Sequence, residues 1–230
     1  MQKQIRRLYI SAAIVGAALS PQAHASTQLI DFEPASLTGL YFAGNSFSQG
    51  DYTMSVDFDA GIVDGASSLG ASAPTGNATQ FYSQLNEGGL YVVRTDGGLF
   101  KISAFDAAFV PLNPAASGTT VMVAVGWSPG NLSANADFGM AWLFASSATS
   151  NFPFAHYGNP ADFANFSQLR QAEFFACAYD GVNVCSGPLR NNGQFAIDNI
   201  SVTSVPEPTP TMLLTLGLLA LALHSRRSAR

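Results

Sequence analysis

Basic side chains are scarce in this sequence of 230 residues, and most of them lie at its two ends. Six of the ten Lys and Arg residues fall in the first seven and the last five positions. The rest of the chain keeps only Arg94, Lys101, Arg170 and Arg190 against fifteen carboxylates when Glu207 is counted, a net charge near −11. A nucleic-acid partner is therefore excluded, because phosphate binding requires a basic surface.

Histidine is equally rare, and its shortage limits the possible catalytic chemistry. His24 and His224 lie near the two ends, which leaves His156 as the one histidine of the main body. A Ser-His-Asp hydrolase would have to use it, and no strand-turn-helix nucleophile elbow accompanies it. Its setting in an aromatic loop is typical of a packing or hydrogen-bonding residue. We expect no catalytic residue of this kind.

The chain contains two cysteines, Cys177 and Cys185, placed symmetrically about Gly181. A hairpin with an odd-numbered loop would set them opposite each other at the spacing that a disulfide needs. We predict this disulfide, since an exported chain folds in an oxidising compartment. The alternative is two free buried thiols. A zinc site is excluded, because one histidine and a bonded cysteine pair do not supply three ligands.

The first 25 residues have the pattern of a secretory signal peptide. Lys3, Arg6 and Arg7 precede an apolar run over 8–19, and a small-x-small pattern ends at Ala25, directly before Ser26. This pattern predicts export through the Sec translocon and cleavage by signal peptidase between those last two residues.

The last 26 residues have the pattern of a second targeting segment. Pro206-Glu207-Pro208 is followed by an apolar run over 212–223 and then by Arg226, Arg227 and Arg230. The apolar run would enter the inner membrane while the arginines stay in the cytoplasm. Residues 209–223 span roughly 22 Å as a helix, against about 30 Å of hydrocarbon. This short transmembrane helix favours a transient, removable segment over a permanent anchor, and its uniformly apolar character disfavours a buried helix.

This tail resembles the sorting signal of bacterial PEP-CTERM proteins. Pro206, Glu207 and Pro208 match the tripeptide of that signal, and Arg226 and Arg227 match its basic end. The resemblance implies cleavage by an exosortase after transient contact with the inner membrane. It also implies a Gram-negative host that makes exopolysaccharide and biofilm. The product would reside in the cell envelope, at the cell surface or in the extracellular matrix.

Between these segments, residues 26–204 predict one all-β domain. Apolar and polar residues alternate over 51–59, and further strands are expected at 28–32, 89–93, 99–105, 119–127, 138–144, 168–179, 182–185 and 194–202. We expect long loops at 60–80 and 145–165. Asp96-Gly97-Gly98 is typical of a hairpin turn, here between the strands expected at 89–93 and 99–105. This pattern favours a jelly-roll-like β-sandwich with one hairpin disulfide.

The last expected strand carries an irregularity. Phe195 and Ile197 share one parity and Ile200 and Val202 share the other, which predicts a β-bulge that re-aims Asp198. The segment resembles the closing strand of jelly-roll carbohydrate-binding modules. Through Gln194, Phe195 and Asp198 it also matches the Gln-Phe-x-x-Asp signature of one PEP-CTERM family. The opening Ile30-Asp31-Phe32-Glu33 is similar to the first strand of those modules.

The same resemblance implies a structural calcium ion between the first and last strands. Calcium takes six to eight oxygen ligands. We therefore hypothesise that Glu33 and Asp198, with Asp51, hold a Ca²⁺ ion; the alternative is that these are solvated acids on edge strands.

Sugar binding is the activity that the composition favours most. Aromatic rings can stack on a pyranose while neighbouring polar groups bond its hydroxyls. Trp142 and Tyr157 are our candidates; Tyr82 and Tyr91 also lie near expected loops. For Trp127 and Trp142 we prefer a core position. We predict a non-catalytic surface or matrix protein that binds exopolysaccharide. The alternative is a glycoside hydrolase acting on surface polysaccharide, with Glu87 and Glu173 as candidate carboxyls but no carboxylate cluster on one strand.

Overall fold

A computed structural model describes residues 25–70, 73–85, 88–110, 120–131, 136–143, 153–178 and 194–206, together with Gly217 and His224. Contacts divide the chain into two compact units. One is Ser26–Val205, and the other joins Met1–Ala25 to Pro206–Arg230. Among the described residues, none belongs to a helix with the length and apolar character needed to cross a membrane.

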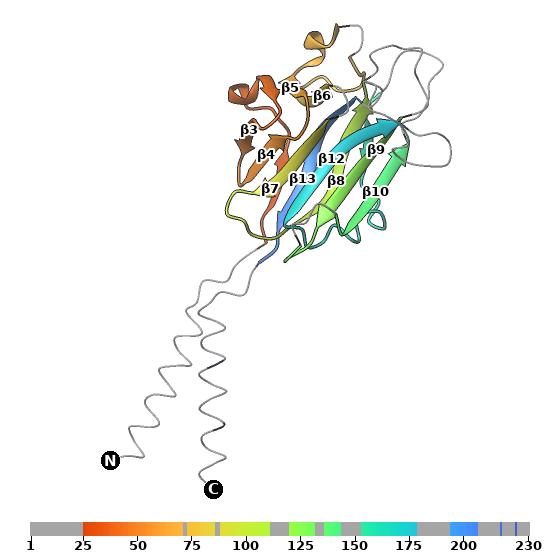
Figure 1. The fold of residues 1–230 in the computed structure, drawn as a ribbon. Coiled ribbons are helices and arrows are strands. Elements are labelled where there is room, and N and C mark those ends of the chain that lie inside the picture. Colours follow the sequence, from red (N-terminus) through yellow and green to blue (C-terminus); the bar gives the residue numbers. More distant parts are fainter. Residues whose placement is uncertain are drawn as a thin grey trace. The chain divides into compact units, whose positions relative to one another are not determined.

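The Ser26–Val205 unit is all-β and consists of two antiparallel sheets, as predicted (Figure 1). The first sheet, here sheet A, has the order β11 (Ala155–Tyr157), β8 (Phe100–Phe109), β13 (Phe195–Ser204), β6 (Phe81–Leu85), β5 (Ala60–Asp64) and β2 (Gly39–Phe42), and β1 (Thr27–Ile30) also pairs with β13. The second, sheet B, has the order β10 (Phe138–Leu143), β9 (Thr120–Trp127), β12 (Gln171–Ala178), β7 (Gly89–Arg94), β4 (Tyr52–Val56) and β3 (Ser46–Gln49). Two short 3₁₀ helices, Ala35–Leu37 and Ala66–Ser68, lie in the connections.

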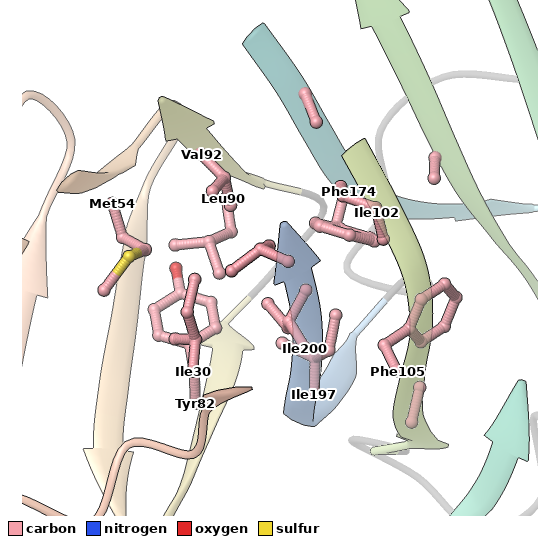
Figure 2. Close-up of a cluster of buried hydrophobic side chains, with 14 of the residues drawn as sticks. Ile30, Met54, Tyr82, Leu90, Val92, Ile102, Phe105, Phe174, Ile197 and Ile200 are labelled. Atoms are coloured by element: carbon pink, nitrogen blue, oxygen red, sulfur yellow. The ribbon is translucent and has the colours of Figure 1, made fainter. Parts of the chain in front are cut away.

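The core lies between the two sheets and is built from alternating apolar residues. On β4 every second residue is buried, which matches the alternation seen in the sequence. Ile197 and Ile200 from sheet A meet Leu90 and Phe174 from sheet B, and all four are fully buried (Figure 2). Burial of these large side chains supplies most of the driving force for folding.

The bulge predicted in the last strand is confirmed. The register of β13 against β8 shifts between Asp198 and Ser201, and Asn199 has a positive φ of 52°. On the other edge of β13, residues 195–197 pair with β6 and residues 200–203 pair with β1. The bulge therefore lies where β13 changes partners, and it lets Ile197 and Ile200 both face the core.

Three expectations about the connections were wrong. The predicted loop over 145–165 contains the short strand β11, because Ala155–Tyr157 pairs with β8. The predicted loop over 60–80 contains β5, because the short run Ala60–Asp64 pairs with both β2 and β6. The Asp96-Gly97-Gly98 turn is present, with Gly97 at φ 72°, but it does not form a hairpin. The strands on either side of it belong to different sheets, so this turn carries the chain from sheet B to sheet A.

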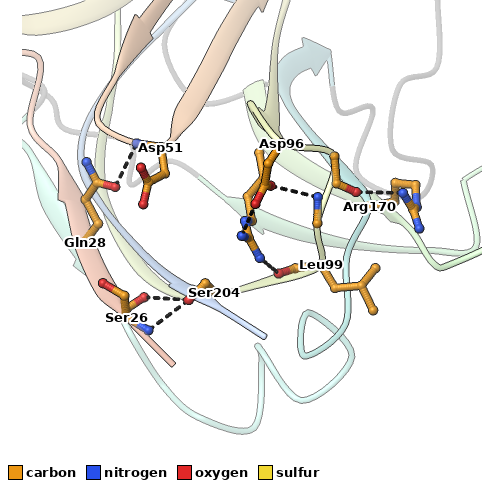
Figure 3. Close-up of polar contacts among 10 residues, drawn as sticks. Ser26, Gln28, Asp51, Asp96, Leu99, Arg170 and Ser204 are labelled. Atoms are coloured by element: carbon orange, nitrogen blue, oxygen red, sulfur yellow. Dashed lines mark hydrogen bonds and ion pairs between the residues drawn. The ribbon is translucent and has the colours of Figure 1, made fainter. Parts of the chain in front are cut away.

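Both ends of this unit meet at one end of sheet A. The backbone N–H of Ser26 donates to Ser204 Oγ at 2.8 Å, and the N–H of Ser204 donates to the carbonyl of Ser26 at 2.9 Å (Figure 3). The turn after β7 lies at the same end, where Arg170 Nη1 donates to the carbonyl of Gly97 at 2.6 Å. Ordered pairing therefore extends to the expected signal-cleavage position.

Candidate functional site

The outer face of sheet B carries a row of side chains that point away from the core. Alternate residues of β7, β12 and β9 belong to the core, so Tyr91, Glu173 and Val125 face outward. The strand register places these three side by side. The row ends at Gly139 on β10 in one direction and continues through Ser55 on β4 to Ser46 on β3 in the other. We call this row, together with Asp57, the Glu173 face.

Glu173 and Tyr91 are neighbours across two central strands, and their side chains are hydrogen-bonded to each other. Gly89 makes room for this arrangement. A Cβ atom at Gly89 would come within 2.6 Å of Glu173 Oε1, so any larger residue there would push the carboxyl aside. Both Glu173 and Tyr91 keep part of their surface exposed to solvent.

The environment of Glu173 favours its neutral form. Its pKa is raised from 4.5 to about 7, mainly by burial and also by the nearby Asp57 carboxylate, while the hydrogen bond with Tyr91 opposes the shift. The pKa of Tyr91 rises to about 12, mainly through burial and also through both carboxylates. Asp57 is exposed, and its backbone N–H donates to the carbonyl of Gly89 at 2.9 Å. Glu173 is thus poised to exchange a proton near neutral pH.

Trp127 forms one side of this face. Its ring centroid lies 6.1 Å from that of Tyr91, and only 6% of its surface is exposed. Its burial was predicted, although it shares the outward parity of Val123 and Val125 instead of facing the space between the sheets. Trp127 therefore supports Tyr91, whose partly exposed ring is the surface that a ligand can meet.

A second polar cluster lies on the outer face of sheet A at the bulge. Asp198 is 1% exposed and accepts hydrogen bonds from Asn77 Nδ2 at 2.7 Å and from the N–H of Asn199 at 2.8 Å. Asn199 Nδ2 donates in turn to Asp106 at 2.8 Å, and Asp106 contacts His156 Nδ1 at 2.7 Å. Burial raises the pKa of Asp198 to about 7. His156 therefore has the hydrogen-bonding role expected of it.

The three carboxylates proposed for calcium are not gathered in one place. Glu33 is near enough to Asp198 to influence its pKa, but Asp51 lies in the turn before β4, where its N–H donates to Gln28 (Figure 3). Within the described ranges, no three His, Cys, Asp or Glu side chains form a group that could hold a metal. The oxygens of Asp198 already accept amide hydrogen bonds. As arranged, these three residues do not fit a shared ion.

The predicted sugar-binding pair is divided between the two sheets. Trp142 lies on β10 of sheet B opposite Met122, whereas Tyr157 lies on β11 of sheet A opposite Phe105. The Tyr157 ring packs 5.3 Å from that of Phe105, against the core. Tyr82, another expected stacking ring, is fully buried in the core. Tyr82 is therefore closed to a ligand, and the pairing of Trp142 with Tyr157 stays a prediction.

The other predicted residues lie partly outside the described ranges. In the family signature, Gln194 and Phe195 are buried at the start of β13. Cys177 lies on β12 opposite Val121, and no described cysteine is a free thiol. Its expected partner Cys185 lies outside the described residues, so the disulfide stays a prediction. The same holds for the sorting signal, of which Pro206 alone is described, and for Glu87.

Sequence reasoning missed the pairing of Tyr91 with Glu173. The sequence did hold a signal for it: Glu173 is a single charged residue inside the apolar run of β12, and Tyr91 alternates with the core residues Leu90 and Val92. Which strands become neighbours decides that these two residues meet. That order depends on contacts distant in sequence, and periodicity does not report it.

Comparison with known proteins bears on the fold. No protein-family model matches the sequence, and no curated protein matches it. The chain is similar to a DUF4465 family protein from Bacteroides caccae. The two share 9% identity over 79% of this chain and 100% of that chain, with a TM-score of 0.51. A xylan-binding CBM22-2 domain of Xyn10C from Paenibacillus barcinonensis shows 13% identity over 77% of this chain and 99% of its own, with a TM-score of 0.38. The mannan-recognising module TmCBM27 shows 13% identity over 80% of this chain and 99% of its own, with a TM-score of 0.36. The first similarity supports the two-sheet sandwich fold.

Proposed function

We propose that the Ser26–Val205 unit is a non-catalytic module that binds a surface or extracellular polysaccharide through the Glu173 face. One observation carries the proposal: the partly exposed ring of Tyr91 lies beside a partly exposed carboxyl in the middle of a sheet. An aromatic ring offers a pyranose an apolar stacking surface, and a carboxyl bonds its hydroxyl groups.

The shape of the row suits an extended chain of sugars. Small residues flank Tyr91, Glu173 and Val125: Ser55 and then Ser46 on one side, and Gly139 on the other. A polymer could therefore cross several strands without meeting a bulky side chain at either end. Gly139 is exposed, and Ser55 is partly exposed. Such contacts give weak binding for one sugar unit and greater affinity for several.

The proposal includes export and the removal of both terminal segments. The two terminal segments direct the protein across the inner membrane, where signal peptidase removes the first and an exosortase removes the second. The mature protein then resides in the envelope, at the cell surface or in the extracellular matrix. Intact-mass analysis of the native protein should give a chain that begins at Ser26 and lacks the six terminal basic residues. A species that still ends at Arg230 would contradict this processing.

Binding is tested with the exopolysaccharide of the producing organism. Tyr91→Ala should weaken binding about tenfold or more, the effect of about 1.4 kcal/mol of lost stacking. Phe42→Ala is the matched control, because Phe42 is an exposed ring on β2 of the other sheet (59% exposed) and should not matter. Equal affinities for the wild type and Tyr91→Ala, with both proteins folded, would refute this binding face.

One observation favours glycoside hydrolysis as a second candidate. Glu173 has a raised pKa and lies near a second carboxylate, Asp57, which is the pairing that a general acid and its partner require. The same binding assay separates the two functions if new reducing ends are measured. Release of reducing sugar by the wild type, and its loss in Glu173→Gln, would establish the hydrolase and overturn the non-catalytic module.

A further inference from the structure

The Glu173 face carries negative charge without a described positive partner. Glu173 and Asp57 are its two ionisable acids, and no basic side chain contributes to the pKa shift of Glu173. The three described basic residues of the unit are engaged or placed elsewhere. Arg94 pairs with Asp96, Arg170 donates to the Gly97 carbonyl, and Lys101 lies on β8 in the other sheet.

Glu173 and Asp57 meet at Gly89: a Cβ atom there would come within 2.6 Å of Glu173 Oε1, and the N–H of Asp57 donates to the Gly89 carbonyl at 2.9 Å. Negative charges on the two carboxyls therefore repel each other, and a charged ligand changes that repulsion. A uronic-acid polymer would bring further negative charge to Glu173 and Asp57, which is unfavourable. A neutral sugar would leave the repulsion unchanged. A ligand with a positive charge would relieve it and form a charge-assisted hydrogen bond, which is stronger than a bond between neutral groups.

We propose that the polysaccharide bound by the Glu173 face is built from amino sugars whose amines are free and cationic. This inference rests on the proposed function. The ammonium group would lie between Glu173 and Asp57 while the sugar ring stacks on Tyr91, whose electron-rich face also attracts a cation.

The charge of the whole exported unit supports the same class of ligand. Residues 26–204 contain fourteen acidic side chains and four basic ones. Such an excess draws cationic polymers toward the protein and repels polyanions, an effect that salt weakens. The local pair of carboxylates and the overall charge are separate observations, and both favour a positively charged ligand.

A matched pair of ligands tests this inference in the exported protein. β-1,4-linked glucosamine pentamer and its fully N-acetylated form share one backbone and differ in charge. At pH 7 the free-amine pentamer should bind the wild type about tenfold more tightly, the value of one charged hydrogen bond. Glu173→Gln should abolish this preference without weakening the binding of the acetylated pentamer.

The controls separate this inference from the proposed function. Asp162→Asn changes the net charge equally but lies in the segment between β11 and β12, so it should keep the preference. Equal binding of the two pentamers, or tighter binding of polygalacturonate, would overturn the amino-sugar ligand and leave glycan binding intact. If neither pentamer, polygalacturonate nor the native exopolysaccharide binds, both proposals fail.

Discussion

Replacing Glu173 by glutamine should stabilise the protein at alkaline pH and have little effect in acid. Glutamine has the same shape as the neutral carboxyl and can keep the contact with Tyr91. The folded-state pKa of Glu173 is raised from 4.5 to about 7 by burial and by Asp57, so the folded state holds this proton more tightly than the unfolded chain. The stability contributed by the proton is complete below the unfolded value, and it is lost as the pH rises through 7.

The size of the effect follows from that shift. One pKa unit corresponds to about 1.36 kcal/mol, so the loss between pH 5 and pH 8 has a ceiling of about 2.5 kcal/mol. Because Glu173 is partly exposed, solvent screening reduces this to about 1 kcal/mol. The Glu173→Gln variant should therefore exceed the wild type by about 1 kcal/mol at pH 8, which is about 2 to 4 °C in melting temperature for a domain of this size.

Urea denaturation at pH 5 and pH 8 measures this difference directly. Asp162→Asn serves as the control, since it removes one negative charge from a place outside the Glu173 face. A Glu173→Gln variant that is no more stable than the wild type at pH 8 would refute the raised pKa. A gain of equal size in Asp162→Asn would assign the effect to net charge instead of to Glu173 and Asp57.

Two further predictions concern the core and the last strand. Phe174→Ala should lower the free energy of unfolding, measured by urea titration, by about 3 to 5 kcal/mol. Phe174 is fully buried, and its ring centroid lies 5.2 Å from that of Phe105. As the control, Phe42→Ala should change the free energy of unfolding by less than about 0.5 kcal/mol. Because Glu33, Asp51 and Asp198 are not gathered in one place, a chelator should leave the thermal midpoint unchanged; a fall of several degrees would show that an ion does join Glu33 to Asp198.

The sequence predicted those strands whose alternation is strong. Thr120–Trp127 was expected within one residue of its bounds, and Tyr52–Val56 begins within one residue of the expected start but ends three residues before the expected end. Both were found because one face of each strand is apolar. Five strands were missed: Gly39–Phe42, Ser46–Gln49, Ala60–Asp64, Phe81–Leu85 and Ala155–Tyr157. They are short, and they form strands because neighbouring strands offer them hydrogen bonds.

The bulge was predictable because it changes the alternation of apolar residues within one short stretch of sequence. The change of parity between Ile197 and Ile200 is required by a core that both side chains must reach. Tyr91 and Glu173 leave no such local pattern, since they are 82 positions apart in the sequence. Their meeting depends on β7 and β12 being neighbours, which the connection after Arg94 makes possible by crossing to the other sheet.

The position of β13 determines how the domain would bear mechanical load. A force applied through the tail beyond Ser204 pulls along β13, which runs beside β8 over its length and is flanked on its other edge by β6 and β1. Ladder hydrogen bonds lie perpendicular to the strands, so such a force shears many of them together instead of opening them one at a time. The pairing of β13 with β8 would therefore resist a pull on Val205 as one unit.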